Sequence, residues 1–325
     1  MRAIQITNDS TYQSAVVSLS QDALDDFEVL IQISASTLNY KDALAVTGKG
    51  PVVRRFPLIP GIDLAGTVVE STDDRYACGD KVILNGWGLG EKYHGGLAEF
   101  ARVKADWLVP LPDKMSFVHA MSIGTAGYTS MLCVNALQSA GVLPHSGPIA
   151  VTGASGGVGS IAIGLLARRG YTVTAITGKI EEEAFLLKLG ASEVLDRAAF
   201  CAPGKPLQKE NFAGAVDVSG SHTLANLCAQ MQYGGVVSAC GLAQGMDFPS
   251  SVAPFILRGV SLIGIDSVYQ PYQNRLRAWQ ALAEETTESR LLAATTTIGL
   301  PEVNDACQRI VAGKVTGRFL VDPSR

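Results

Sequence analysis

The sequence predicts an α/β protein that combines a doubly wound parallel sheet with a discontinuous, barrel-like, mainly β domain. The prediction rests on three observations: a glycine-rich turn at residues 153–159, an alternation of strand and helix patterns after it, and β-rich runs without such alternation before it. Alternating strands and helices indicate a parallel sheet, whereas short β-rich runs separated by turn residues indicate antiparallel pairing. With 325 residues, the chain is long enough for two domains.

The glycine-rich turn follows a short apolar segment, Ile149–Thr152, and precedes apolar residues at helical spacing. Gly153, Gly156 and Gly159 therefore mark the junction of a strand and a helix. At such a junction a diphosphate can contact backbone N–H groups and the positive end of the helix dipole. Ala154 departs from the strict dinucleotide pattern, and a tight turn with close helix packing would need the same glycines.

Before residue 110, β-rich runs are separated by turn residues, with no helical pattern alternating between them. The predicted strands are Ala3–Ile6, Phe27–Ser34, Ala65–Glu70, Lys81–Leu84 and Leu97–Val103. Two segments among them, Leu38–Leu44 and Phe56–Gly66, are expected to be loops.

A helical pattern from His119 to Leu137 leads into the alternating region. The strands predicted there are Tyr171–Thr177, Ser192–Leu195, Ala215–Val218, Gly235–Cys240 and Leu262–Asp266, and the helices are Glu181–Leu189 and Leu224–Met231. A parallel sheet of this kind binds its ligand at the carboxyl ends of the strands.

Beyond this region, the sequence predicts a helix at Tyr272–Ala283, a polar segment at 284–297, a helix from Pro301 to Gly313 and a strand at Val315–Val321. One strand and one helix cannot form a domain, so we expect them to complete the first one. The expected domains are residues 1–120 completed by 268–325, and residues 121–267.

The composition excludes several classes of function. A net charge of −4 does not suit a protein that coats nucleic acid, and no apolar run reaches the ~18 residues of a membrane helix. Six cysteines are scattered without a C-x-x-C pair, which indicates reduced thiols and no clustered zinc site. We therefore expect a cytoplasmic protein that binds neither nucleic acid nor a membrane.

The end of the second sheet strand indicates which nicotinamide cofactor fits. NAD sites place Asp or Glu there, about 20 residues beyond the glycines, whereas this chain has Thr177, Gly178 and Lys179. A hydroxyl, a bare backbone and a cation suit the 2′-phosphate of NADPH, and Arg197 follows the next strand. The same cations would also serve as surface charges, and the acidic run 181–183 lies close by. We favour NADPH over NADH because no carboxylate stands there to repel the phosphate.

Further motifs accompany the glycine turn over almost the whole chain. They are Leu38–Leu44, Thr47–Gly50, Ile59–Asp63, Gly86–Gly88, Gly95–Glu99, Gly124–Thr129, Val151–Gly159 and Pro254–Arg258. With them the chain resembles the medium-chain dehydrogenase/reductase superfamily and, within it, the zinc-independent acrylyl-CoA reductase family. The resemblance implies a Rossmann domain for NADP(H) and a GroES-like catalytic domain. It also implies NADPH-dependent reduction of the α,β double bond of acrylyl-CoA, a 2-enoyl-CoA, to propanoyl-CoA.

Zinc-dependent members of the superfamily carry a cysteine where this chain has Asn39 and a histidine where it has Ile62. Catalytic zinc needs three protein ligands, and residues 122–127 offer no third one. We therefore expect no metal. Reduction of a conjugated carbonyl instead needs hydride delivery to the β-carbon and a hydrogen-bond donor for the enolate oxygen.

Tyr40 is the residue expected nearest this chemistry, because a phenol can donate a hydrogen bond or a proton, with Lys41 beside it to assist. An equally open alternative is that Tyr40 packs beside the nicotinamide. The predicted cofactor-binding residues are Tyr40, Ser155, Gly156, Gly157, Val158, Gly159, Thr177, Gly178, Lys179, Arg197, Leu242, Ile256, Ser267 and Arg318. The last four rest on the resemblance alone.

Two other functions remain open: a quinone or enone reductase on the same scaffold, and a non-catalytic NADPH-binding protein. A CoA substrate would need cations for its phosphates. Lys49, Arg54 and Arg55 are candidates, although a charged surface loop explains them as well. The apolar segment 261–267 ends the predicted sheet, and dimers of the superfamily commonly join at that edge, so we expect a homodimer.

Overall fold

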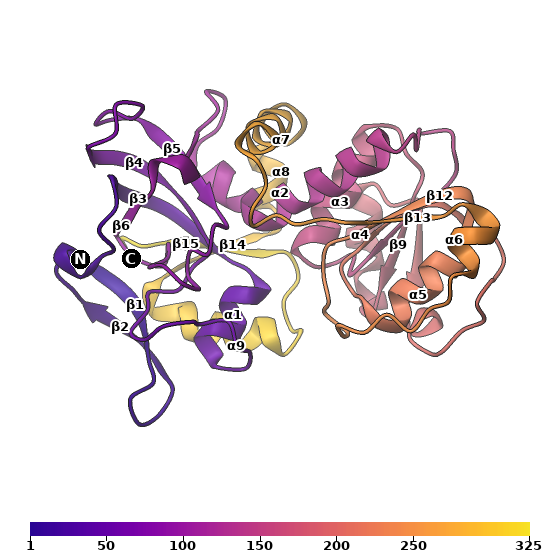
Figure 1. The fold of residues 1–325 in the computed structure, drawn as a ribbon, viewed down its shortest axis with the longest axis horizontal. Coiled ribbons are helices and arrows are strands. Elements are labelled where there is room, and N and C mark those ends of the chain that lie inside the picture. The colour runs from indigo at the N-terminus through magenta and orange to yellow at the C-terminus, as the bar shows by residue number, and fades with distance from the viewer. The chain divides into compact units, whose positions relative to one another are not determined.

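The computed structural model describes all 325 residues of the chain. By its internal contacts, the chain divides into two compact units. Met1–Thr125 and Ser267–Arg325 together form the first, which we call the β-rich unit, and Ala126–Asp266 forms the second, which we call the α/β unit. Figure 1 shows the elements of both units.

The α/β unit is built on a six-stranded sheet in the order β10-β9-β8-β11-β12-β13, in which every pair is parallel. Its strands are β8 (Ile149–Thr152), β9 (Val173–Thr177), β10 (Glu193–Asp196), β11 (Phe212–Asp217), β12 (Met231–Ala239) and β13 (Ser261–Gly264), and its helices are α3 (Gly157–Arg168), α4 (Glu183–Leu189), α5 (Ser221–Ala229) and α6 (Ala253–Arg258). The strand order reverses at β8, which lies between β9 and β11. Such a reversal is where a doubly wound sheet opens a ligand crevice.

The β-rich unit contains a seven-stranded sheet in the order β14-β15-β3-β4-β5-β7, with β6 paired to β3, and a separate two-stranded sheet of β1 and β2. Its strands are β1 (Arg2–Thr7), β2 (Gln13–Ser18), β3 (Val29–Leu38), β4 (Asp63–Ser71), β5 (Lys81–Asn85), β6 (Phe100–Val103), β7 (Val109–Pro110), β14 (Thr295–Gly299) and β15 (Arg318–Asp322). Phe319 of β15 lies opposite Leu38 of β3, so the C-terminal segment completes a sheet begun by the N-terminal strands. The predicted fold class, a parallel doubly wound sheet plus a discontinuous, mainly β part, is confirmed.

The five remaining α-helices are α1 (Tyr40–Thr47), α2 (Phe117–Ser139), α7 (Tyr272–Glu285), α8 (Glu288–Leu292) and α9 (Val303–Val311). Helix α2 is interrupted at Gly124, whose φ of 51° lies in the left-handed region that favours glycine. None of the helices is long and apolar enough to cross a bilayer.

Three local predictions were wrong. The expected loop Leu38–Leu44 contains the start of α1, because the Asp42 carboxylate accepts a hydrogen bond from the Asn39 N–H and caps the helix. The expected loop Phe56–Gly66 contains the start of β4, because Asp63 already pairs with Asn85 of β5. The predicted helix 224–231 ends at Ala229, and Met231 already begins β12.

Helix α7 is anchored to the end of β5 by two fully buried side chains. Arg275 donates through Nη1 to the Asn85 carbonyl oxygen over 2.8 Å, and Trp279 donates through Nε1 to Asn85 Oδ1 over 3.1 Å. The Arg275 guanidinium also lies over the Trp87 ring, 4.8 Å from its centroid. The C-terminal part of the chain thereby fixes the Asn85 amide, which in turn reaches the candidate active site.

Candidate active site

The glycine turn of the α/β unit leaves the backbone bare where β8 passes into α3. Gly153 has a φ of 56°, and a Cβ atom there would lie 2.4 Å from Val218 Cγ2. A Cβ atom on Gly159 would lie 2.4 Å from the Gly153 carbonyl oxygen. Gly156 is the N-cap of α3, so the first N–H groups of a twelve-residue helix follow it. The glycines keep side chains out of this turn, and the N–H groups at the start of α3 fit a diphosphate.

The four residues predicted to bind the 2′-phosphate, Thr177, Gly178, Lys179 and Arg197, gather at the end of β9. Thr177 Oγ1 accepts a hydrogen bond from the Lys179 N–H over 3.0 Å and lies 3.4 Å from Ser155 Oγ. A Cβ atom on Gly178 would lie 2.9 Å from Arg197 Cζ, so the guanidinium rests against this glycine. The turn and the two cations therefore lie together.

An acidic residue lies close to one of these cations. Lys179 Nζ lies 3.7 Å from Glu182 Oε1, a loose ion pair that leaves room for a competing anion.

The other predicted cofactor residues are divided between the units. Gly157 and Val158 begin α3, and Leu242 and Ile256 are also in the α/β unit, with 56% and 72% of their surfaces exposed. Tyr40, Ser267 and Arg318 belong to the β-rich unit. The Ser267 carbonyl oxygen accepts from Arg275 over 3.3 Å, so its backbone is held in place.

A buried network surrounds the Asp63 carboxylate in the β-rich unit. Oδ1 accepts hydrogen bonds from Asn85 Nδ2 and from Thr125 Oγ1, each over 2.5 Å. Oδ2 accepts from Asn39 Nδ2 over 2.7 Å and from the Thr125 N–H over 2.8 Å. Four donors from three distant parts of the sequence therefore compensate one carboxylate that is fully buried.

A second buried carboxylate, that of Asp42, shares the Asn39 amide. Its Oδ2 accepts from the Asn39 N–H over 2.8 Å and from Asn39 Nδ2 over 3.1 Å, and its Oδ1 accepts from the Ile62 N–H over 2.9 Å. Burial, together with the nearby charge of Asp63, raises the pKa of Asp42 to about 7. Asp42 therefore holds a proton through the mildly acidic range.

Arg318 completes this network. Its Nη2 donates to Thr37 Oγ1 over 2.9 Å and to Asn39 Oδ1 over 3.4 Å, while the buried Nε has no hydrogen-bond partner. Burial lowers the pKa of Arg318, and the two carboxylates oppose that effect. A buried guanidinium N–H without a partner fits an anionic ligand such as a diphosphate. Gly124 lies against it, because a Cβ atom there would be 2.7 Å from Nη2.

Tyr40 is the first residue of α1, directly after Asn39, and 48% of it is exposed. Its neighbour Lys41 was expected to assist it, but Lys41 Nζ is paired with Glu91 Oε1 over 2.8 Å. His94 is a structural loop residue, since its Nδ1 accepts from the Ile59 N–H over 3.0 Å.

The structure contains no group of three or more His, Cys, Asp or Glu side chains arranged to hold a metal ion. At the positions of two superfamily zinc ligands stand Asn39, whose amide bridges both carboxylates, and Ile62, whose side chain is apolar. Sequence reasoning missed Asn85, Thr37 and Thr125 as partners of the site. Of these three residues, only Thr125 belongs to one of the sequence motifs, Gly124–Thr129.

Two family models match the chain: "Alcohol dehydrogenase GroES-like domain" over residues 25–113 and "Zinc-binding dehydrogenase" over residues 157–284. A protein of Escherichia coli (strain K12) named "Probable acrylyl-CoA reductase AcuI" is 50% identical over 308 residues, which cover 95% of each chain.

Solved structures of similar sequence have the same fold. The yhdH oxidoreductase from Salmonella enterica in complex with NADP has a TM-score of 0.97 and 48% identity, covering 99% of both chains. Bacillus subtilis protein yhfP with NAD bound has a TM-score of 0.94 and 43% identity, covering 99% of this chain and 98% of that one. The chain therefore belongs to the medium-chain dehydrogenase/reductase superfamily and, within it, to the zinc-independent acrylyl-CoA reductase family.

Proposed function

We propose that this protein uses NADPH to reduce the α,β double bond of acrylyl-CoA to propanoyl-CoA without zinc. Lys179 and Arg197 lie together beside the glycine turn, and this cluster is the main support for the proposal. The chain is also 50% identical to a protein named as a probable acrylyl-CoA reductase. These two cations, with no carboxylate among residues 177–179, suit a 2′-phosphate.

The residues of each unit have separate proposed roles. When bound, NADPH supplies the hydride that adds to the β-carbon, and a proton from the protein or solvent completes the α-carbon. In the α/β unit, Ser155 to Gly159 would hold the diphosphate through backbone N–H groups. In the β-rich unit, Arg318, whose buried Nε has no hydrogen-bond partner, is our candidate for a charged donor to the cofactor. Tyr40 is our candidate for the catalytic residue, because its phenol is half exposed and can donate a hydrogen bond to the substrate carbonyl oxygen.

The Asp42, Asp63 and Asn39 group would act by positioning. Asn39 donates to both carboxylates through Nδ2 and presents Oδ1 to Arg318, so it fixes the guanidinium and the start of α1 together. Tyr40 follows Asn39 directly, and its backbone position depends on the same contacts.

The proposed partners are the acyl-CoA substrate and a second copy of the chain, and the proposed location is the cytoplasm. All six cysteines are free, as is typical of a reducing compartment. Strand β13 lies at the edge of the parallel sheet. Its residues Leu262 and Ile263 are apolar and only partly buried, which suits pairing across a two-fold axis.

The function is tested by NADPH oxidation with acrylyl-CoA, crotonyl-CoA and a small quinone side by side. We expect the highest kcat/KM with acrylyl-CoA. Replacing Tyr40 with Phe should lower kcat by about 100-fold if its hydroxyl donates in the transition state, with little change in the KM for NADPH. Faster turnover of the quinone would instead assign a quinone reductase, and no turnover of any substrate would assign a non-catalytic NADPH-binding protein.

The cofactor choice is tested by calorimetric binding of NADPH and NADH. Lys179→Asp should weaken NADPH binding by about 2–3 kcal/mol, because it removes a cation and adds a carboxylate beside Glu182, and should change NADH binding little. Lys188→Asp, an exposed position on α4, makes the same change in net charge and serves as the control. Equal affinity of the unmodified protein for NADH and NADPH would contradict the proposed selectivity.

The raised pKa of Asp42 predicts how stability changes with pH. Between its ordinary value of 3.8 and the folded value of about 7, folded Asp42 keeps a proton that the unfolded chain releases, so its contribution declines as pH rises through that window. Urea unfolding at pH 4 to 8 should show the unmodified protein losing a few kcal/mol (about 1.4 per unit) relative to Asp42→Asn. Only the slope is compared, since the amide also alters the local hydrogen bonds. Parallel curves for Asp42→Asn and the exposed control Asp113→Asn would refute the assignment.

The dimer is tested by sedimentation. We expect a species of twice 34.2 kDa for the unmodified protein at micromolar concentration. Ile263→Pro removes a backbone donor from β13, and Ser261→Lys places a charge on its exposed end, so both should shift the protein toward the monomer. Far-ultraviolet circular dichroism checks that each variant is folded. An unmodified protein that sediments as a 34.2 kDa monomer would refute the dimer.

A further inference from the structure

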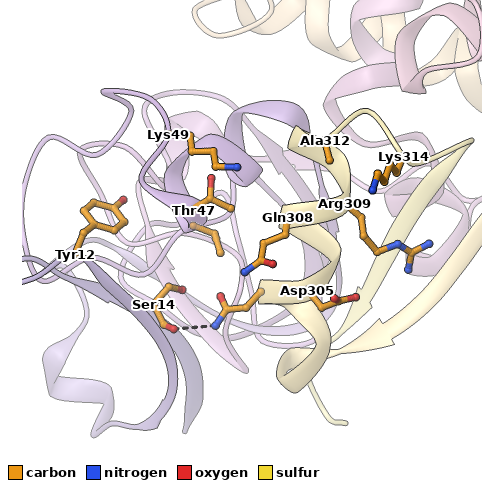
Figure 2. Close-up of a pocket in the computed structure, with 11 residues that line it drawn as sticks. Tyr12, Ser14, Thr47, Lys49, Asp305, Gln308, Arg309, Ala312 and Lys314 are labelled. Atoms are coloured by element: carbon orange, nitrogen blue, oxygen red, sulfur yellow. Dashed lines mark hydrogen bonds between the residues drawn. The ribbon is translucent and has the colours of Figure 1, made fainter.

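A pocket of about 620 Å³ lies in the β-rich unit, where α1 and α9 pack together (Figure 2). It is separate from the Asp63 network. Its lining comes from Tyr12 and the start of β2, from the end of α1, and from α9 and the turn after it. The lining residues used below are Tyr12, Ser14, Lys49, Asn304, Arg309 and Lys314.

The charge of this pocket is predominantly positive. Lys49 follows the end of α1, Arg309 lies in the last turn of α9, and Lys314 follows that helix, as Figure 2 shows. None of the three cations has an ion-pair partner within the structure, and the Arg309 guanidinium lies over the Phe319 ring, 5.4 Å from its centroid. Asp305 is the one carboxylate in the lining. In a chain of net charge −4, this local excess of cations favours an anion.

Two buried polar atoms in the same lining have no partner. The Asn304 amide donates through Nδ2 to the Ser14 carbonyl oxygen over 2.8 Å, but its Oδ1 accepts nothing, and Ser14 Oγ also makes no hydrogen bond. Buried polar atoms of this kind are normally satisfied, so a ligand with its own donors and acceptors is the expected partner. The Tyr12 ring, whose hydroxyl donates to the Ala45 carbonyl oxygen, adds an aromatic wall.

We infer that this pocket binds the phosphorylated adenosine end of a coenzyme A thioester, an inference that rests on the proposed function. The volume falls within the ~300–1,000 Å³ of small-molecule sites. Lys49, Arg309 and Lys314 bind the phosphates, while Asn304 and Ser14 meet the ribose or base.

The length of α1 supports this ligand. Tyr40 begins the eight-residue helix and Lys49 follows its C-cap, so a helix about 12 Å long lies between the two residues. Coenzyme A carries its thioester and its nucleotide at opposite ends of the pantetheine arm. A substrate of that shape needs a reacting group and a phosphate site that are separated in this way.

The cations also have a simpler role, because positive charges near helix C-termini stabilise the helix dipole. That role explains their position but neither the volume nor the unpaired atoms. The two roles differ in their consequences: charge reversal in a helix cap lowers stability alone, whereas charge reversal in a phosphate site lowers affinity.

The test is calorimetric titration of the full-length protein with coenzyme A, dephospho-coenzyme A, ADP and inorganic phosphate. Saturating NADPH is present, so that the glycine turn is not available to these probes. The variants are Lys49→Glu and Lys314→Glu, and the matched control is Lys114→Glu, an exposed lysine of the same unit outside the pocket. We expect each pocket variant to weaken coenzyme A binding by about tenfold or more, the loss of one charged hydrogen bond, and the control to leave it unchanged. Coenzyme A should bind more tightly than dephospho-coenzyme A.

Equal affinities in the pocket variants and the control would overturn the inference. Binding of ADP or phosphate as tight as that of coenzyme A would assign a free nucleotide or phosphate site and overturn it as well. Turnover of acrylyl-CoA separates this result from the proposed function. If the protein turns over acrylyl-CoA and the variants bind coenzyme A as tightly as the unmodified protein, the pocket assignment is wrong and the proposed function stands. If the variants bind coenzyme A more weakly and the protein turns over no acrylyl-CoA, the pocket assignment stands and the proposed function is wrong.

Discussion

The β-rich unit depends on the compensation of one buried carboxylate, that of Asp63. A buried carboxylate without donors would cost several kcal/mol, so its four hydrogen bonds are a condition for folding. Those donors come from Asn39 before α1, Asn85 at the end of β5 and Thr125 after the interruption of α2. Residue 124, where α2 is interrupted, is a glycine for the same reason, because a side chain there would collide with Thr37 and Arg318. One charge therefore sets where three segments of the chain meet.

The network extends this constraint to the C-terminal part of the chain. Asn85 donates to Asp63 and accepts from Trp279, and its carbonyl oxygen accepts from Arg275. Helix α7 is thus tied to the carboxylate through a single amide. Arg318 on β15 reaches the same centre through Asn39. The discontinuity of the unit follows from this arrangement, since residues near both ends of the chain are needed to balance the buried charges.

A different constraint governs the α/β unit: the close approach of backbone to backbone. Gly159 packs against the Gly153 carbonyl oxygen, and Gly178 packs against Arg197. A side chain at either position would collide with these neighbours, so the glycines are needed for the turn and the Arg197 guanidinium to pack as they do. The site therefore depends on two features of the sequence: glycines in the turn, and Thr177, Gly178 and Lys179 where NAD sites place a carboxylate.

The sequence by itself determined the parallel sheet, the glycine turn and the cofactor class, because periodicity and local residue type decide them. Thr177, Gly178 and Lys179 are neighbours in the chain, so their shared chemistry was visible without coordinates. Tertiary structure alone decided what lies around Asp63 and in the pocket beside α9. Asn85 and Arg318 are far from Asp63 in sequence. Lys41 was expected to assist Tyr40 but pairs with Glu91, because long-range pairing depends on strand register and burial. No local pattern carries that information.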